Sequence, residues 1–231
     1  MVTLWQALEV GVTRRQVRAA LARGTWRRAD QAVYLVRGGF DDTPARRRRA
    51  AIRAAVLSLG PGAVAVYETA AELHGIAGLR ASKEIHISVP AVLAKRRIDS
   101  ALRVHQLCLP PGTVGSVAGI AATVPLRTVA DLLCRVDRFA AVAVLDSALN
   151  SGLVQAAELA AIPAMIRRRR GAVAARSFLA EADGRAQSPL ETRVRLRCVD
   201  GGVPRTISNT RFSTPTGTCS LSLMPLGRVV G

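Results

Sequence analysis

The sequence feature that most constrains the fold is a short basic segment, TRRQVRAALARGTWRR at residues 13–28. Thr13 is a good N-cap, because its hydroxyl can accept a hydrogen bond from a backbone N–H one turn further on. Gly11 suits a tight turn before a helix, and Gly24 suits the left-handed position that often follows one. The segment therefore predicts a helix that runs from Arg14 to about Arg23.

This predicted helix has two different faces. At about 100° per residue, its apolar side chains fall on one side, and these are Val17, Ala20 and Leu21. Three arginines cluster roughly 120° away, and these are Arg14, Arg15 and Arg18. One face can therefore pack against the protein while the other presents guanidinium groups.

The flanking residues predict the partners of this helix. Upstream, Leu4, Trp5 and Leu8 have helical spacing and predict a supporting helix. Downstream, Trp26 and the apolar residues 33–36 predict two short strands. Helix, turn, helix and hairpin is the order of a winged helix-turn-helix domain.

The chemistry of the basic face fits DNA, because the planar fork of arginine matches phosphate oxygens or the O6/N7 edge of guanine. A recognition helix fits the major groove, and arginines of the following wing would meet phosphates. The alternative is an amphipathic helix whose arginines are simply solvated. The residues that we predict to contact DNA are Thr13, Arg14, Arg15, Arg18, Arg23, Trp26, Arg27 and Arg28.

The segment GVTRRQVRAALARGTWRRADQAVYLV resembles the N-terminal winged helix of AbiEi-type antitoxins, which belong to type IV toxin–antitoxin systems and are widespread in actinobacteria. The family pattern carries Gly before Val-Tyr, where this chain has Ala32. The resemblance implies a sequence-specific DNA-binding regulator that represses its own operon by binding double-stranded DNA at its own promoter. It also implies a functional link to a nucleotidyltransferase-like toxin, whose effect such antitoxins counter without needing a stable complex.

Charge supports a polyanionic partner, because 33 Lys and Arg residues face 16 Asp and Glu, which gives a net charge of +17. A membrane is the weaker choice. The longest uncharged stretch, residues 106–126, is broken by three prolines and three glycines, and the first residues lack the pattern of a signal peptide. We expect a cytoplasmic protein.

The middle of the chain alternates strand and helix patterns. The segments TAAELHGI, IHISVP and VPLRTVADLL occur in the order found in the central α/β region of the same antitoxin-like proteins. Residues 85–89 alternate apolar and polar side chains like a half-buried strand, and residues 102–107 predict a second strand. Two apolar-periodic helices follow, and the second ends near residues 150–152.

Several groups in this region offer chemistry, but each has an ordinary structural explanation. Glu68 and Glu72 lie four apart, for which a solvated helix face is expected rather than a metal or proton-transfer site. The three histidines at positions 74, 86 and 105 fall on separate elements, and we expect structural roles rather than a metal site. The arginine runs 46–49 and 167–170 suit solvated helix ends, with non-specific phosphate contact as the alternative.

The stretch GRAQSPLETRVRLRCVDGGVP resembles the opening helix of a nuclease-like domain related to very-short-patch-repair endonucleases, which have the restriction-endonuclease fold. Glu191 matches the acidic position of that family, whose acids and lysine hold Mg²⁺. The tail departs from the pattern, because no acid follows Asp200 and Ser222 falls about where Asp is expected. Glu191 is therefore a degenerate catalytic candidate at most, and a helix-surface pair with Arg195 is its alternative.

These patterns predict an α/β protein in three segments: a winged helix-turn-helix domain at residues 1–40, an α+β domain at 41–155, and a helical segment with an incomplete, truncated nuclease-like fragment at 156–231, whose tail is either folded or disordered. No phosphate-binding, dinucleotide-binding, hydrolase or metalloprotease motif occurs. We therefore expect no enzymatic activity, no cofactor and no bound metal. The alternative function is a Mg²⁺-dependent DNA endonuclease, inactivated by loss of its metal ligands.

Overall fold

The structure is a computed structural model that describes residues 1–30, 33–36, 43–91, 101–202, 208–214 and 217–223. Ala32 and the domain boundary predicted at residue 40 lie outside the described residues. The chain divides into two compact units, the first formed by residues 1–76 and 80–132, the second by residues 77–79 and 133–231. Helices and sheets occur together, so the fold is mixed α/β, as predicted.

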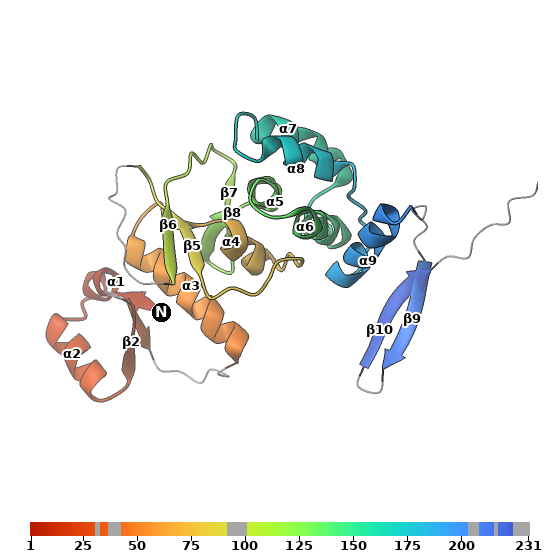
Figure 1. The fold of residues 1–231 in the computed structure, drawn as a ribbon. Helices are drawn as coiled ribbons and strands as arrows, with labels where there is room; N and C mark the ends of the chain where they lie inside the picture. Colours follow the sequence, from red (N-terminus) through yellow and green to blue (C-terminus); the bar gives the residue numbers. More distant parts are fainter. Residues whose placement is uncertain (31–32, 37–42, 92–100, 203–207, 215–216, 224–231) are drawn as a thin grey trace, which may run out of the picture. The chain divides into compact units, whose positions relative to one another are not determined.

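The first unit begins with a small sheet and two short helices, coloured red in Figure 1. The elements in chain order are β1 (Val2–Thr3), α1 (Leu4–Glu9), α2 (Arg14–Ala22), β2 (Trp26–Asp30) and β3 (Val33–Val36). The strands are antiparallel in the order β1-β3-β2. The predicted helices and strand pair are confirmed, whereas the two-residue strand β1 is too short to leave a pattern.

A second, five-stranded sheet lies in the first unit. Its strands are β4 (Val64–Ala65), β5 (Ile85–Ser88), β6 (Leu102–His105), β7 (Val114–Val117) and β8 (Ile120–Thr123), in the order β6-β5-β4-β8-β7. The pairs β4–β8 and β5–β6 are parallel, and the pairs β4–β5 and β7–β8 are antiparallel. Edge strand β6 is therefore held by backbone hydrogen bonds to β5 alone within this sheet.

Two helices supply the core against this sheet. Helix α3 (Pro44–Leu59) begins at the N-cap Thr43, whose hydroxyl accepts a hydrogen bond from the Arg46 amide at 3.3 Å. It ends at Gly60, and α4 (Tyr67–His74) ends at Gly75, both glycines having positive φ. The two helices bury apolar residues together with those of the strands, namely Ile52, Ala55, Ala70, Leu73, Ile85, Ile87, Leu102, Ile120 and Ala122.

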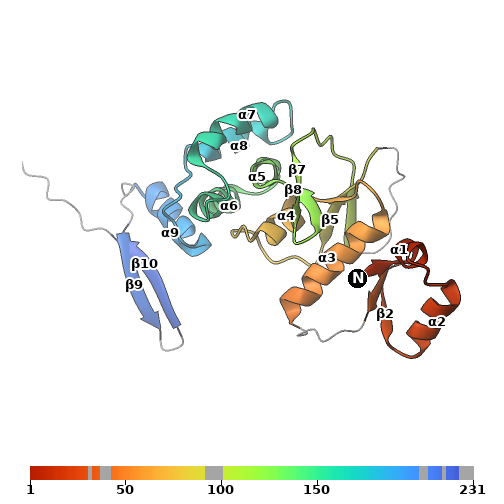
Figure 2. The same ribbon diagram turned by 180° about the vertical axis from the view of Figure 1, so that it is seen from behind.

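The second unit is built around one apolar helix, α6 (Arg138–Asn150), whose N-cap is Asp137. It follows α5 (Pro125–Leu133), and it is packed against α8 (Ala172–Leu179) and α9 (Pro189–Asp200). The short helices η1 (Ala156–Ala161) and α7 (Ile162–Met165) lie between α6 and α8 in the chain, and Figure 2 shows α7 beside α8. A side chain at Gly171 would place a Cβ 2.5 Å from the Cys134 carbonyl oxygen, so only glycine fits this turn.

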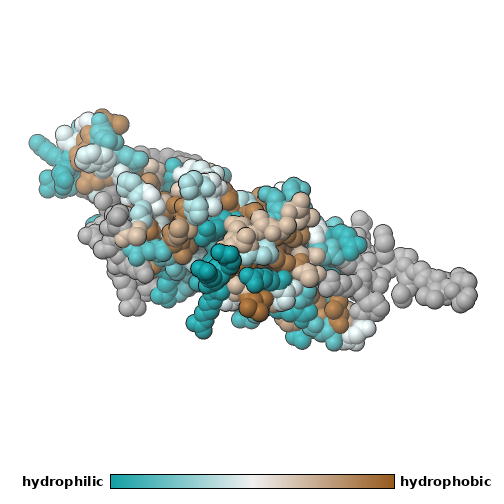
Figure 3. Space-filling view, turned by 90° about the horizontal axis from the view of Figure 1, so that it is seen from above, coloured by the Kyte–Doolittle hydropathy of each residue, from teal (hydrophilic) through white to brown (hydrophobic). Residues whose placement is uncertain are grey.

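The last described elements are the antiparallel strands β9 (Ser208–Thr214) and β10 (Gly217–Leu223). Ser222 pairs with Asn209 in this hairpin. None of the helices in the described parts of the chain is long and apolar enough to cross a membrane. Hydrophilic and hydrophobic residues are interspersed over the face drawn in Figure 3.

Candidate nucleic-acid interface

Both N-terminal helices begin with the same reciprocal cap. The Thr13 hydroxyl accepts from the Gln16 amide at 3.2 Å, and the Gln16 side-chain oxygen accepts from the Thr13 amide at 2.7 Å. Thr3 and Gln6 repeat this arrangement at the start of α1, with distances of 3.1 and 3.0 Å. Two orphan donors are thereby satisfied at each helix start without any charged group. The cap predicted at Thr13 is confirmed.

Helix α2 has the two predicted faces. Val17 and Ala20 are buried, and Leu21 is half-buried. The Thr25 hydroxyl donates to the Ala20 carbonyl at 3.0 Å and closes the end of the helix, where Gly24 has φ +69°. The opposite face presents three exposed arginines, namely Arg14, Arg15 and Arg18. The apolar face fixes the helix, so its basic face is held outward.

The arginines of the N-terminal segment have no acidic partner among the described residues. Within the described ranges, no hydrogen bond or ion pair joins a carboxylate to any of Arg14, Arg15, Arg18, Arg23, Arg27 or Arg28. All six are exposed, and the last two lie on β2. Residues 1–36 contain only two acids, Glu9 and Asp30, and Glu9 accepts from the Trp5 indole N–H at 2.7 Å. The segment therefore offers positive charge that is available to a partner.

The two tryptophans differ in environment. Trp5 was expected to help α1 pack, but its side chain is 69% exposed, and Ala7 is the buried residue of that helix. The prediction was wrong for Trp5 because Leu4, Ala7 and Leu8 are the half-buried or buried positions of this short helix, whereas the exposed Trp5 donates its indole N–H to Glu9. Trp26 is half-buried, with its ring centroid 5.9 Å from that of Tyr34 on the neighbouring strand. A DNA contact by Trp26 stays a prediction.

The arginine run at 46–49 is not simply a solvated helix end. Arg48 donates through Nε to both Glu72 carboxylate oxygens at 3.2 and 3.1 Å. Its other two nitrogens donate to the carbonyls of Lys83 and Glu84, each at 2.7 Å. Arg48 therefore clamps α3 to α4 and to the segment before β5, a long-range role that local sequence does not reveal.

Two of the three histidines meet. His86 Nδ1 and His105 Nε2 lie 3.0 Å apart, whereas His74 Nε2 lies 2.7 Å from the Thr123 carbonyl oxygen. Glu68 Oε2 lies 3.5 Å from His86 Nε2. The solvated face expected for the two glutamates holds for Glu72, which is exposed and pairs with Arg48, and is wrong for Glu68, which is half-buried beside His86. Among the described residues, no group of three or more His, Cys, Asp or Glu side chains could hold a metal ion.

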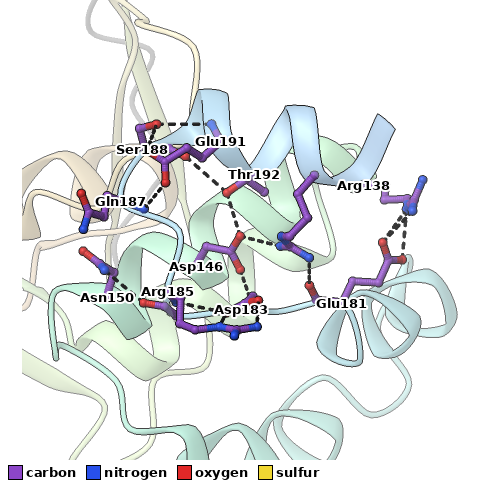
Figure 4. A network of polar contacts seen from close by, with 12 residues as sticks. Arg138, Asp146, Asn150, Glu181, Asp183, Arg185, Gln187, Ser188, Glu191 and Thr192 are labelled. Carbon is purple, nitrogen blue, oxygen red and sulfur yellow. Dashed lines mark hydrogen bonds and ion pairs between the residues drawn. The ribbon is translucent and has the colours of Figure 1, made fainter. Parts of the chain in front are cut away.

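A buried carboxylate joins three segments of the second unit, as Figure 4 shows for its labelled members. Asp146 on α6 is 1% exposed. It accepts from the Asp183 amide at 2.6 Å, the Thr192 hydroxyl at 2.7 Å and Arg195 Nη2 at 2.7 Å. Burial raises the pKa of Asp146 above its usual range, although these three donors favour the charged form. A lone acid within the apolar run AAVAVLDSALN was the available signal for this site.

Glu191, the degenerate nuclease candidate, is engaged at the start of α9. Its carboxylate accepts from the Gln187 amide at 2.9 Å and from the Ser188 hydroxyl at 3.3 Å. The Ser188 hydroxyl in turn accepts from the Glu191 amide at 3.3 Å. The alternative pair with Arg195 is wrong, because Arg195 is held by Asp146 and by the Glu181 carbonyl at 2.8 Å. Glu191 has the contacts of a helix-capping residue.

Comparison with known proteins places this geometry in a family. Residues 63–181, just over half of the chain, match the family model described as AbiEi antitoxin C-terminal domain. Two uncharacterized proteins of Mycobacterium tuberculosis, one from strain CDC 1551 / Oshkosh and one from strain H37Rv, are each 38% identical over 146 residues. That match covers 63% of this chain and 52% of each relative, so the chain spans about half the length of the curated relatives it matches. The chain belongs to the AbiEi antitoxin family.

Proposed function

We propose that this protein is a sequence-specific DNA-binding regulator of the type IV antitoxin kind, which represses its own operon. Residues 1–40 would act as a winged helix-turn-helix domain. Their order of two short helices followed by an antiparallel strand pair supports this assignment. The proposed further segments are an α+β domain at 41–155 and a helical segment with the tail at 156–231.

The observation that carries the proposal is the outward face of α2. Arg14, Arg15 and Arg18 are exposed on a helix whose other face is anchored by Val17 and Ala20. A guanidinium held in this way can bind guanine O6 and N7 or a phosphate in bidentate fashion. The exposed Arg27 and Arg28 on β2 would meet the DNA backbone.

The position of the family match supports the same division of labour. The matching model describes a C-terminal domain, and in this chain 62 residues precede the match at residue 63. If the residues before this match bind DNA, the matched region can carry the antitoxin function. In this function, the protein would counter the effect of a nucleotidyltransferase-like toxin, which is the toxin class that the antitoxin family implies.

The decisive experiment measures binding of the full chain to its own upstream intergenic DNA and to random DNA of equal length, across salt concentrations. We expect tighter binding to the upstream DNA at every salt concentration. The single variants R14A, R15A and R18A should each lose about 1–3 kcal/mol of binding free energy where the residue contacts a base. Arg176→Ala is the matched control, since Arg176 is exposed on α8 and has no described acidic partner.

Two outcomes would count against the proposal. Equal affinity for both DNAs would leave only charge-driven binding, which falls steeply with salt. Equal losses in R176A and in the α2 variants would mean that net charge, rather than the face of α2, governs binding. Co-expression with a nucleotidyltransferase-like toxin from the same locus tests the antitoxin part, for which rescue of growth is expected.

The C-terminal segment would contribute no catalysis in this proposal. Both members of the Ser188–Glu191 pair are engaged in capping α9, which supports a structural role. We propose that residues 156–231 carry at most a degenerate remnant of a nuclease-like domain. Absence of Mg²⁺-dependent plasmid cleavage by the full chain is the expected result, and cleavage that disappears in Glu191→Ala would overturn it.

A further inference from the structure

The pair of histidines in the first unit joins the edge strand of the larger sheet to its neighbour. Strands β5 and β6 are parallel, with His86 opposite Arg103 and Ser88 opposite His105. Because side chains alternate along a strand, His86 and Ser88 share one face while Ile85 and Ile87 point into the apolar core on the other. The two imidazoles therefore meet diagonally across the β5–β6 pair, on the face away from that core.

The geometry of this contact requires a shared proton. His86 Nδ1 and His105 Nε2 are 3.0 Å apart, and the ring planes lie within 17° of each other. A hydrogen bond at this distance needs an N–H on one nitrogen and a lone pair on the other. Tyr67 on α4 packs edge-on against both rings, with centroids 6.1 Å from that of His86 and 5.1 Å from that of His105. The ring of Tyr67 limits how far the imidazoles can separate without wider movement.

The charged groups around the two histidines favour protonation of one of the two imidazoles. Glu68 Oε2 lies 3.5 Å and Glu84 Oε2 lies 3.6 Å from His86 Nε2. The other Glu84 oxygen accepts from Arg103 on β6, which balances part of this negative charge. On the α3 side, Arg48 is directed to Glu72 and to the carbonyls of Lys83 and Glu84. One imidazolium between two carboxylates is therefore stabilised.

A second proton has the opposite effect. With both rings protonated, each of the two facing nitrogens carries a hydrogen, and two positive charges stand at contact distance. The neutral pair and the singly protonated pair both keep the hydrogen bond, and only the doubly protonated pair loses it. His86 is 5% exposed, so water screens the repulsion between the two charged rings only weakly.

We propose that His86 and His105 form a proton-operated clasp that holds edge strand β6 against β5 and releases it when both rings are protonated. Besides the β5–β6 ladder, the described contacts of this edge include the hydrogen bond from Arg103 to Glu84 and the Leu107 amide donating to the Ser88 hydroxyl at 3.0 Å. Loss of the clasp opens β6 and the residues that follow it. The clasp is a conformational device of the antitoxin domain and does not depend on DNA binding by α2.

The chain has only three histidines, so imidazole nitrogen NMR of the labelled full chain resolves each of them. We expect His86 and His105 to titrate in two coupled steps separated by about one pH unit or more. Below the lower step, the amides of residues 102–105 should lose protection from hydrogen exchange. Chelator in every sample prevents a metal ion from bridging the two rings.

Two variants complete the test. In His105→Gln, His86 should titrate in one step, and the pH-dependent loss of protection at β6 should disappear. His74→Gln is the matched control, since its amide can still donate to the Thr123 carbonyl, and it should retain both steps. Independent single-step titration of His86 and His105 in the wild-type chain would overturn the proposal, as would pH-independent protection of β6. These wild-type measurements decide the matter even if H105Q does not fold.

Discussion

The arginines on α2 and the paired arginines on α6 and α9 have opposite environments. On α2, Arg14, Arg15 and Arg18 are exposed, and no carboxylate among the described residues binds them. In the second unit, Arg138 pairs with Glu181 and Asp200, and Arg195 pairs with the buried Asp146. The same residue type is held by internal acids on α6 and α9 and remains available to a partner on α2.

The difference teaches that basic composition alone does not locate a binding surface. The 33 Lys and Arg residues are spread over the whole chain, but internal ion pairs engage some of them. Paired arginines should matter for the free energy of unfolding, and unpaired ones for binding. Each prediction below can break or sharpen this comparison, beginning with the largest expected effect.

Arg195→Met should destabilise the second unit by about 3–5 kcal/mol, because it leaves the Asp146 carboxylate buried without its cationic partner. Denaturant unfolding of the full chain, with hydrogen exchange of α6 and α9, measures this loss. Burial raises the pKa of Asp146, so its charge is lost early as the pH falls, and the cost of R195M should shrink in acid. Arg193→Met, exposed on the same helix, should change little, and an equal loss there would contradict the role of the pair.

Arg18→Ala should behave in the reverse way, with a loss of about 1–3 kcal/mol in binding to upstream DNA and almost none in the free energy of unfolding. The physical reason is that Arg18 is exposed and has no hydrogen bond or ion pair to another described side chain. Binding titrations and thermal unfolding of the same preparation separate the two quantities. If R18A lost stability but kept its affinity for DNA, the contrast between the exposed and the paired arginines would not hold.

Arg48→Ala should change stability less than Arg195→Met and more than Arg18→Ala. Its guanidinium connects Glu72 to two carbonyls, but its side chain is only half-buried, so we expect a loss of about 1–2 kcal/mol of stability in the first unit. The neighbouring Arg49→Ala is the control, since Arg49 is exposed and makes no described contact. Urea unfolding should distinguish the two variants. Similar curves would mean that α3 does not depend on this clamp.

The smallest expected effect concerns Arg185, whose side chain is 73% exposed. Its hydrogen bonds to Asp183 lower the pKa of that carboxyl. A lowered pKa in the folded state contributes stability above the unfolded value, near 3.9, and this contribution is lost as the pH falls through the folded value. Arg185→Ala should therefore cost less than about 1 kcal/mol at neutral pH and nothing in strong acid or high salt. A loss of unfolding free energy that does not depend on salt would contradict the solvent-exposed ion pair between Arg185 and Asp183.

Local sequence signals predicted much of the fold. Helix α2 begins at the expected residue, Arg14, because Thr13 acts as its cap, and it ends close to the expected position before Gly24. Strand β7 was missed because its sequence, VGSV, lacks the alternation of a half-buried strand. Edge strands need little burial, so hydrophobic periodicity marks them poorly.

The site was less predictable wherever it depends on contacts distant in sequence. The basic face of α2 follows from helical spacing, and the structure has it as expected. The Asp146–Arg195 pair, however, joins residues 49 positions apart, and His86 meets His105 only because β5 and β6 are parallel neighbours. Such pairs are set by tertiary packing, which no local window of sequence contains.

The uncharged caps of α1 and α2 have a consequence for the electric field at the N-terminal segment. Both helices use glutamine at the third position, whereas the caps at Gln155 and Ser188 in the second unit use Glu158 and Glu191. A carboxylate there would offset the positive end of the helix dipole, worth roughly half an elementary charge. Glutamine satisfies the same amide and leaves that dipole end positive beside the arginines. Gln16→Glu would thus keep the cap and the fold of α2. It would also place a negative charge beside the arginines, which repels a phosphate. The replacement of the Gln16 amide nitrogen by an oxygen therefore changes the attraction for phosphate without changing the cap.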